Sequence, residues 1–178
     1  INNMHTRYND ILSIDCIRLL GPDYAIMQSD YAKFHNRIPL RLGPIKRLLI
    51  HFGAADTDNI TGKCIDAFLK CDRNDIRVDV IISGNMQHKN TINQQIKNFD
   101  NINLYSGINN LVPLISKADL SIGASGATSW ERCCLGLPAL VISSADNQRS
   151  IAEGLHSHEL VKWLGHKNEV SSGKIKDS

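Results

Sequence analysis

Segments typical of strands and of helices alternate along this chain from Lys46 onward, and this alternation restricts the possible folds more than any other feature. Short apolar runs are each followed by a stretch with helical spacing of apolar residues. We predict strands over residues 47–52, 76–82, 101–105, 119–122, 137–143 and 160–164, and helices over 61–70, 89–99, 110–117, 128–135 and 148–155. The apolar runs lack polar alternation, as expected for strands covered on both faces. The pattern predicts an α/β fold, a Rossmann-like parallel sheet with helices on both faces.

The ends of the chain look different from this central region. Residues 1–45 have no clean periodicity, and we expect them to be a linker or tail that follows a separate N-terminal domain. Residues 46–168 would form the Rossmann-like domain, and residues 169–178 a polar tail. The first residue is Ile rather than Met. We therefore treat the chain as a piece of a longer protein.

Charge and composition exclude several classes of function. The chain has 20 Lys and Arg against 18 Asp and Glu, a net charge of +2, whereas a nucleic-acid binder would show a strongly basic stripe. No apolar run approaches the roughly 18 residues of a membrane span, and the start lacks the apolar stretch of a signal peptide. The five Cys form no C-x-x-C pair, which favours small buried residues in a reducing cytosol over a zinc site. We expect a cytoplasmic protein without a metal or cofactor.

Ligands of parallel sheets bind beyond the carboxyl ends of the strands, so the loops that follow the predicted strands are the candidate sites. The first such loop begins with Gly53, which lets a ligand approach the backbone closely, and continues through Asp56. Asp58 or Asn59 can cap the next helix, whose free N–H groups favour an anion. This loop is either a capped connection or part of a ligand site.

A second loop consists almost entirely of small residues and leads straight into a helix. Such a loop offers what a diphosphate needs, namely backbone N–H donors, a positive helix end and no bulky side chains. It matches neither the phosphate loop with Gly-Lys-Ser/Thr nor the dinucleotide turn. Glu131 lies about one turn into the helix, where it either suits the helix end or accepts hydrogen bonds from two ribose hydroxyls. The loop residues are Gly123, Ala124, Ser125, Gly126, Ala127, Thr128 and Ser129.

A third loop, over residues 143–148, ends with Asn147 and Gln148. Amide side chains bridge donors and acceptors on a sugar without adding charge. The pair is therefore either a sugar contact or simply the polar start of a helix.

The chain contains the stretch Gly126-x-Thr128-x-Trp130-Glu131-Arg132-Cys133-Cys134-Leu135-Gly136-Leu137-Pro138. This stretch is the most specific part of a close resemblance to the UDP-sugar hydrolases of pseudaminic acid biosynthesis, which act on UDP-2,4-diacetamido-2,4,6-trideoxy-β-L-altropyranose. The likeness covers roughly residues 19–155, with Leu19-Leu20-Gly21-Pro22, Phe52-Gly53, Asp56-x-Asp58-Asn59 and Asn147-Gln148 as further matches.

This resemblance implies the C-terminal half of a GT-B architecture, related to the nucleotide-sugar-binding half of MurG-type glycosyltransferases. It implies that residues 125–129 hold the diphosphate of a UDP-sugar, that Glu131 holds the uridine ribose, and that Asn147 and Gln148 face the sugar. The family's proposed catalytic His lies in its first domain, so no catalytic residue is assigned here and this piece alone is expected to be inactive. His51, near a strand end, is interpreted as a packed residue.

The chain departs from the family pattern at three positions. Ala54 replaces a second Gly in the first loop and would narrow the space beside the phosphates, while Ser125 and Ala127 vary the Gly-rich run of the second. Three functions therefore stay open. The chain is the binding half of a UDP-sugar hydrolase, the corresponding half of a glycosyltransferase, or a module that only senses a nucleotide sugar. In the first case water attacks either the anomeric carbon or the phosphorus.

Overall fold

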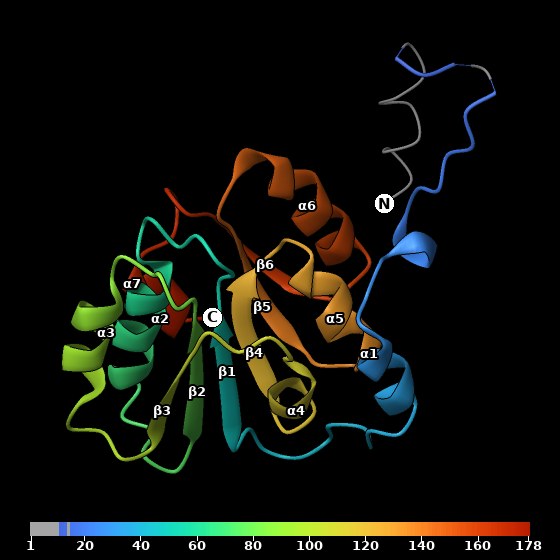
Figure 1. Ribbon diagram of the computed structural model, residues 1–178. Coiled ribbons are helices and arrows are strands. Elements are labelled where there is room, and N and C mark those ends of the chain that lie inside the picture. The colour runs from blue at the N-terminus through green and yellow to red at the C-terminus, as the bar shows by residue number, and fades with distance from the viewer. Residues whose placement is uncertain (1–10, 14) are drawn as a thin grey trace.

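A six-stranded, fully parallel sheet runs through the computed structural model, which describes residues 11–13 and 15–178 (Figure 1). The strand order is β3-β2-β1-β4-β5-β6, and every neighbouring pair is parallel. This is the doubly wound order in which the chain starts in the middle of the sheet and builds outward in both directions. The predicted Rossmann-like sheet is confirmed. Its strands are β1 (Arg47–His51), β2 (Arg77–Ile82), β3 (Ile102–Ser106), β4 (Leu120–Ala124), β5 (Ala139–Ser143) and β6 (Lys162–His166).

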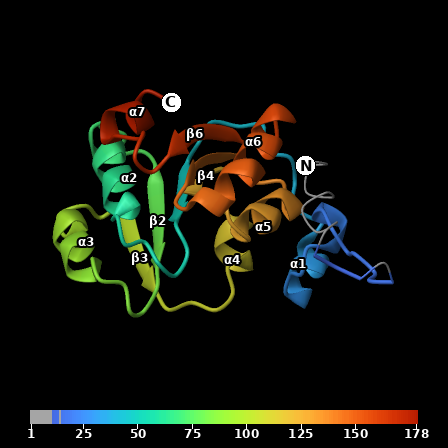
Figure 2. The ribbon, with the colours of Figure 1, turned by 90° about the horizontal axis from the view of Figure 1, so that it is seen from above.

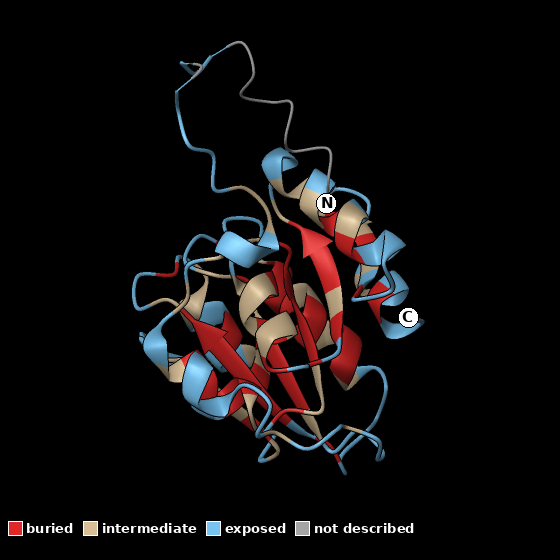
Figure 3. Ribbon diagram, turned by 90° about the vertical axis from the view of Figure 1, so that its right-hand side faces the viewer, coloured by how far each residue is buried: buried red, intermediate tan, exposed pale blue. Residues whose placement is uncertain are grey.

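Helices cover both faces of the sheet, as the sequence predicts (Figure 2). One face carries α2 (Ile60–Leu69), α3 (Lys89–Ile96) and α7 (Ser172–Lys176). The other carries α1 (Ser29–Phe34), α4 (Val112–Ile115), α5 (Thr128–Cys134) and α6 (Arg149–Ser157). The described residues also form two short 3-10 turns, η2 (Pro22–Tyr24) and η3 (Asp146–Gln148). Burial is concentrated in the strands and in the helix faces turned toward them (Figure 3).

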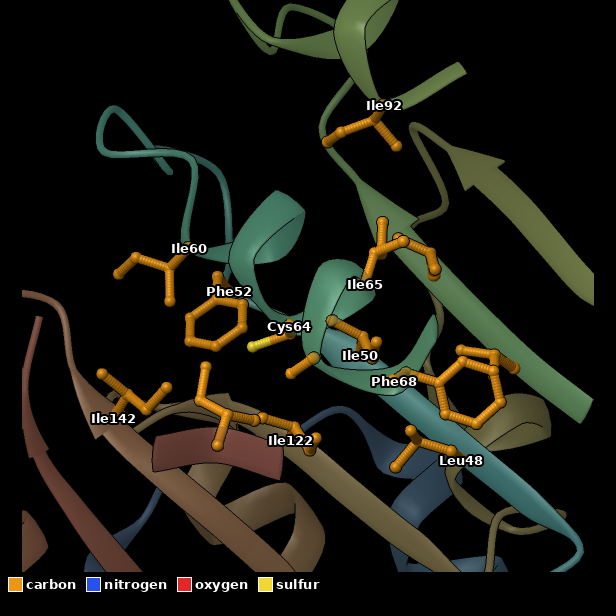
Figure 4. Close-up of a cluster of buried hydrophobic side chains, with 14 of the residues drawn as sticks. Leu48, Ile50, Phe52, Ile60, Cys64, Ile65, Phe68, Ile92, Ile122 and Ile142 are labelled. Atoms are coloured by element: carbon orange, nitrogen blue, oxygen red, sulfur yellow. The ribbon is translucent and has the colours of Figure 1, made fainter. Parts of the chain in front are cut away.

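The core on the α2 face shows why the strands have this sequence. Leu48, Ile50 and Phe52 pack there against α2, while Leu49, between them, packs in the cluster on the opposite face (Figure 4). Both sides of the central strand are thus buried, which removes the polar alternation seen in half-exposed strands. Burial of each large apolar side chain stabilises the fold by about 1.5–3 kcal/mol. From α2, residues Ile60, Cys64, Ile65 and Phe68 meet these strands at helical spacing.

Residues before Lys46 contribute to the domain, although we expected a linker there. Helix α1 lies against the second face, and its Tyr31 is only 1% exposed within the cluster that contains Leu135 and Leu137. At the other end of the chain, residues 169–178 include α7, whose Ile175 is buried beside α2. Each of these short helices places a single large residue in the core, so neither has an apolar periodicity that could be detected in the sequence.

Arg41 ties the preceding segment to the sheet through four hydrogen bonds. Its guanidinium donates to the carbonyl oxygens of Ala118 (2.7 Å), Ile115 (2.9 Å), Leu135 (2.7 Å) and Gly136 (2.9 Å). These carbonyls lie at or just beyond the C-terminal ends of α4 and α5, where a positive charge is favourable.

Candidate functional site

The candidate loops meet where the strand order reverses. From the adjacent strands β1 and β4 the chain leaves toward opposite faces, because α2 packs on one side of the sheet and α5 on the other. In open α/β sheets this topological switch point is where ligands bind, outside the carboxyl ends of the strands. The loops after β1 and β4 therefore border a common edge, and the loop after β5 is the next one along.

The loop after β1 is a capped connection, with one predicted cap, Asn59, and one cap that was not predicted, Asp56. The buried carboxylate of Asp56 accepts hydrogen bonds from the backbone N–H groups of Ile60 and Thr61, both at 2.8 Å. Asn59 caps as predicted, since its Oδ1 accepts from the Gly62 N–H at 3.2 Å. Asp58 instead forms an ion pair with Lys167 at 2.6 Å, so the proposed Asp58 cap is not formed. The partial positive charge at the N-terminus of α2 is thus already neutralised by the Asp56 carboxylate of its own loop.

The loop after β4 is fixed at both ends and open in the middle. Buried Ser125 donates through its hydroxyl to the Gln148 carbonyl (3.3 Å) and to the Ser143 hydroxyl (3.4 Å). Ser129 closes a turn by donating its N–H to the Gly126 carbonyl at 2.9 Å. No side chain of the described residues caps α5, in contrast to α2. Between the fixed ends, Ala127 is exposed and Thr128 is half-buried.

The loop after β5 folds back over the loop after β4. Gln148 uses its side-chain oxygen internally, accepting from the N–H (3.0 Å) and the hydroxyl (3.1 Å) of Ser144. Its amide nitrogen lies over Gly126, 3.4 Å from where a Cβ on that residue would stand. Asn147 is exposed, in the 3-10 turn η3. The structure therefore brings Gln148 against the second loop, and Asn147 stays on the surface beside it.

Arg132 also belongs to this region, although the sequence pattern assigned it no role. Its side chain lies under the second loop and is 3% exposed. The guanidinium Nη2 donates to the Ala124 carbonyl (2.6 Å) and the Ser129 hydroxyl (3.1 Å), which are the two ends of the loop.

Glu131 and Tyr31 form a second unexpected contact. The carboxylate oxygen Oε2 and the Tyr31 hydroxyl are both buried, and neither makes a well-aligned hydrogen bond with any described residue. They nevertheless influence each other, because burial and the nearby Glu131 charge raise the pKa of Tyr31. Burial likewise raises the pKa of Glu131, against the opposing effects of Tyr31 and Arg132. Glu131 is thus half-buried beside α1.

His51 ends β1 next to Gly123, its partner on β4. Burial lowers the pKa of His51 to about 4, with a smaller contribution from the positive charge of Arg132. The imidazole is therefore neutral near pH 7, in keeping with the interpretation of His51 as a packed residue.

The sequence of residues 63–172, more than half of the chain, matches the family model of the glycosyltransferase family 28 C-terminal domain. The chain belongs to this family. The matched region starts within α2 and includes the loops after β4 and β5. In the described part of this family 28 domain, no helix has the length and apolarity needed to cross a membrane.

Relatives of this family 28 domain are considerably longer than the chain. The uncharacterized protein MJ1062 of Methanocaldococcus jannaschii is 31% identical over 134 residues, which are 72% of this chain and 28% of the relative. The spore coat polysaccharide biosynthesis protein SpsG of Bacillus subtilis is 23% identical over 134 residues, or 75% of this chain and 39% of the relative. The chain thus spans well under half of either protein.

Solved structures share the fold at low sequence identity. WaaG, a glycosyltransferase involved in lipopolysaccharide biosynthesis, superposes with a TM-score of 0.59 at 15% identity, over 85% of this chain and 41% of WaaG. UDP-GlcNAc 2-epimerase from Neisseria meningitidis, solved bound to UDP-GlcNAc, gives a TM-score of 0.56 at 18% identity, over 82% of this chain and 38% of the epimerase. The fold is that of the C-terminal half of GT-B glycosyltransferases.

Proposed function

We propose that this chain is the UDP-sugar-binding domain of an enzyme that releases UDP from a 2,4-diacetamido-trideoxyhexose in nonulosonic (pseudaminic) acid and surface-polysaccharide biosynthesis. One observation carries the proposal. A run of small residues, from Gly123 to Ser129, leads from the end of β4 through its loop into α5 at the switch point of the sheet, where a nucleotide can approach the backbone. Membership of glycosyltransferase family 28 and the UDP-GlcNAc complex of the similarly folded epimerase support a UDP-sugar as the ligand.

Each candidate residue then has a role in this proposal. The loop of residues 125–129 holds the diphosphate through its backbone N–H groups other than that of Ser129, which donates to the Gly126 carbonyl, and Glu131 accepts hydrogen bonds from the ribose hydroxyls. Asn147 and the amide nitrogen of Gln148 face the sugar. Gly53 borders the phosphates, while Asp56 and Asn59 act indirectly by fixing the start of α2.

The chemical contribution of this half is stabilisation of the leaving group. When water attacks the anomeric carbon, the bond from that carbon to the phosphate oxygen breaks, UDP leaves with the bonding electrons, and negative charge grows on that oxygen. Donors already oriented toward that oxygen stabilise the charge without having to reorganise. When water instead attacks the phosphorus bonded to the sugar oxygen, the bond between those two atoms breaks, the sugar leaves as its hydroxyl and the water oxygen stays on UDP. The same donors then stabilise the negative charge on the phosphate oxygens.

A glycosyltransferase is the second candidate, and the family match favours it directly. In that case an acceptor hydroxyl replaces water as the nucleophile. The two functions are separated by incubating the full-length parent protein with the UDP-sugar in the absence of any acceptor. A hydrolase releases UDP at its full rate under these conditions, whereas a transferase needs an acceptor to do so.

The binding proposal is tested on this chain by calorimetric titration with UDP and with inorganic pyrophosphate, which lacks a ribose. Glu131→Gln should weaken UDP binding by about 1.5–3 kcal/mol, the range for hydrogen bonds to a charged group, and leave pyrophosphate binding unchanged. Glu159→Gln, an exposed substitution beyond the far end of α6, is the matched control. Equal losses for both ligands, or no loss for either, would remove Glu131 from the site.

A further inference from the structure

Arg132 carries a positive charge into the interior without an ion pair. Its side chain is 3% exposed, and no carboxylate among the described residues lies within ion-pair distance of it. Its Nε is buried and has no hydrogen-bond partner among the same residues. A buried charge without an ion pair lowers the stability of the folded state. We therefore expect a further interaction to compensate the Arg132 charge.

The guanidinium remains charged at neutral pH. Burial lowers the pKa of Arg132 to about 10, against smaller opposing effects of Cys133 and Glu131. The titratable groups near it are the Glu131 carboxylate and the Cys133 thiol, both on α5 itself, and the neutral His51 ring at the end of β1. Glu131 is the only acid among these groups, and burial raises the pKa of that carboxyl.

The charge lies at the switch point itself. Nη1 of Arg132 is 2.5 Å from the position that a Cβ on Gly123 would occupy, and the His51 carbonyl oxygen is also 2.5 Å from that position. Gly123 and His51 are partners in the β1–β4 pairing. A side chain at residue 123 would therefore push the guanidinium away, and glycine allows it to reach the carboxyl ends of both central strands.

We propose that Arg132 is a positioning residue that selects a diphosphate at this site. Its two hydrogen bonds hold the ends of the Ala124–Ser129 loop, and its unneutralised charge lies directly behind the loop that would receive the phosphates. A bound diphosphate supplies the counter-charge that residues 11–13 and 15–178 do not. The inference rests on the proposed nucleotide site. It adds that the Arg132 charge makes the site bind a nucleoside diphosphate more tightly than a nucleoside.

The test compares the wild-type chain with Arg132→Met, which removes the charge while filling the buried space, and with Arg132→Lys, which keeps the charge. Affinities for UDP and uridine are measured by calorimetry at several salt concentrations. Arg132→Met should weaken UDP binding about tenfold or more, as expected for loss of a charge-assisted interaction, and leave uridine binding unchanged. It should also flatten the salt dependence of UDP affinity, because fewer charges then attract the phosphates. Arg132→Lys should keep most of the preference for UDP over uridine.

Arg41→Gln is the matched control, because it releases the opposite ends of α4 and α5 without altering the charge at the loop. The proposal would be overturned if Arg132→Met weakened the binding of UDP and of uridine equally, or if Arg132→Lys bound UDP no more tightly than Arg132→Met. Arg132 would then only stabilise the loop. Should Arg132→Met fail to fold, Arg132→Gln, which removes the charge and keeps a side-chain N–H donor for the Ala124 carbonyl, takes its place with the same expectation.

Thermal melting with pyrophosphate separates failure of this inference from failure of the proposed function. If the wild-type chain binds neither UDP nor uridine, the nucleotide proposal fails. Pyrophosphate should still raise the melting temperature of the wild-type chain and not that of Arg132→Met. Equal stabilisation of both proteins, or of neither, overturns the role of Arg132.

Discussion

Among the individual residues, the polar groups under the switch point make the stability of the domain depend on pH. His51 is the clearest example. Burial lowers its pKa to about 4, compared with an ordinary value of 6.5 in the unfolded chain, and the Arg132 charge acts in the same direction. Between these two values the unfolded state binds more protons than the folded state. Stability is therefore complete above about pH 6.5 and falls as the pH is lowered toward 4.

We predict that His51 accounts for about 3 kcal/mol of the stability lost between pH 6.5 and pH 4, because a tenfold difference in proton affinity between the folded and unfolded states corresponds to about 1.4 kcal/mol. Urea unfolding of the wild-type chain and of His51→Gln at pH 7, 6, 5 and 4 measures this contribution. The variant should show a shallower pH dependence by that amount. Observation by NMR of a His51 ring that titrates near pH 6.5 would contradict the prediction.

Among the secondary-structure elements, the short helices α4 and α5 depend on a residue from outside the strand–helix repeat. Arg41 donates to four carbonyl oxygens at or beyond their C-terminal ends. The segment that carries Arg41 also positions α1 against α5 through the His35 ring, whose Nδ1 lies 2.8 Å from the Cys134 carbonyl oxygen. The candidate loop before α5 is thus supported from its far end by the segment that precedes β1.

Arg41→Ala should lower the free energy of unfolding by about 1.5–3 kcal/mol, because the carbonyls lose charged donors and only part of them regain water. Denaturant titration measures the change. Arg37→Ala, on the exposed part of the same segment, is the control and should stay within about 0.5 kcal/mol of the wild type. Equal effects of the two substitutions would mean that the four hydrogen bonds add no net stability.

In the molecule as a whole, the domain extends beyond the repeat of strands and helices. Tyr31 of α1 is buried in the cluster formed with Leu49, Ile115 and Leu135, so the segment before β1 is part of the core of the second face. The same tyrosine lies beside Glu131, which couples this segment to the candidate ribose contact.

Two shortened chains test this extension. A chain that starts at Pro44 loses Tyr31 and Arg41, whereas a chain that starts at Ala25 keeps both. We expect the shorter chain to be less stable by at least about 3 kcal/mol, the cost of removing one large buried aromatic side chain. Thermal and urea unfolding of the two proteins provide the comparison. Equal stability would mean that α1 is merely attached to the domain surface.

The parallel sheet, and the edge at which the candidate loops lie, can be predicted from the amino-acid sequence. Apolar runs such as residues 47–52 identify buried strands from local composition, and a β-α repeat leaves few topologies. Because parallel strands end at the same edge, the loops at Gly53, Ser125 and Asn147 are expected on one side of the sheet.

The side chains that act on those loops become known only once the chain has folded. Asp56, rather than Asp58, caps α2, because Lys167 approaches from 109 positions away and pairs with Asp58. Arg41 lies 77 residues before Ala118, and Tyr31 a full 100 residues before Glu131. The burial of Arg132 depends on Gly123 and His51 meeting across two strands. The periodicity of apolar residues predicts which face of a helix or strand is buried, but not which residues it packs against. Contacts between residues so far apart in the sequence form only when the helices pack on the sheet.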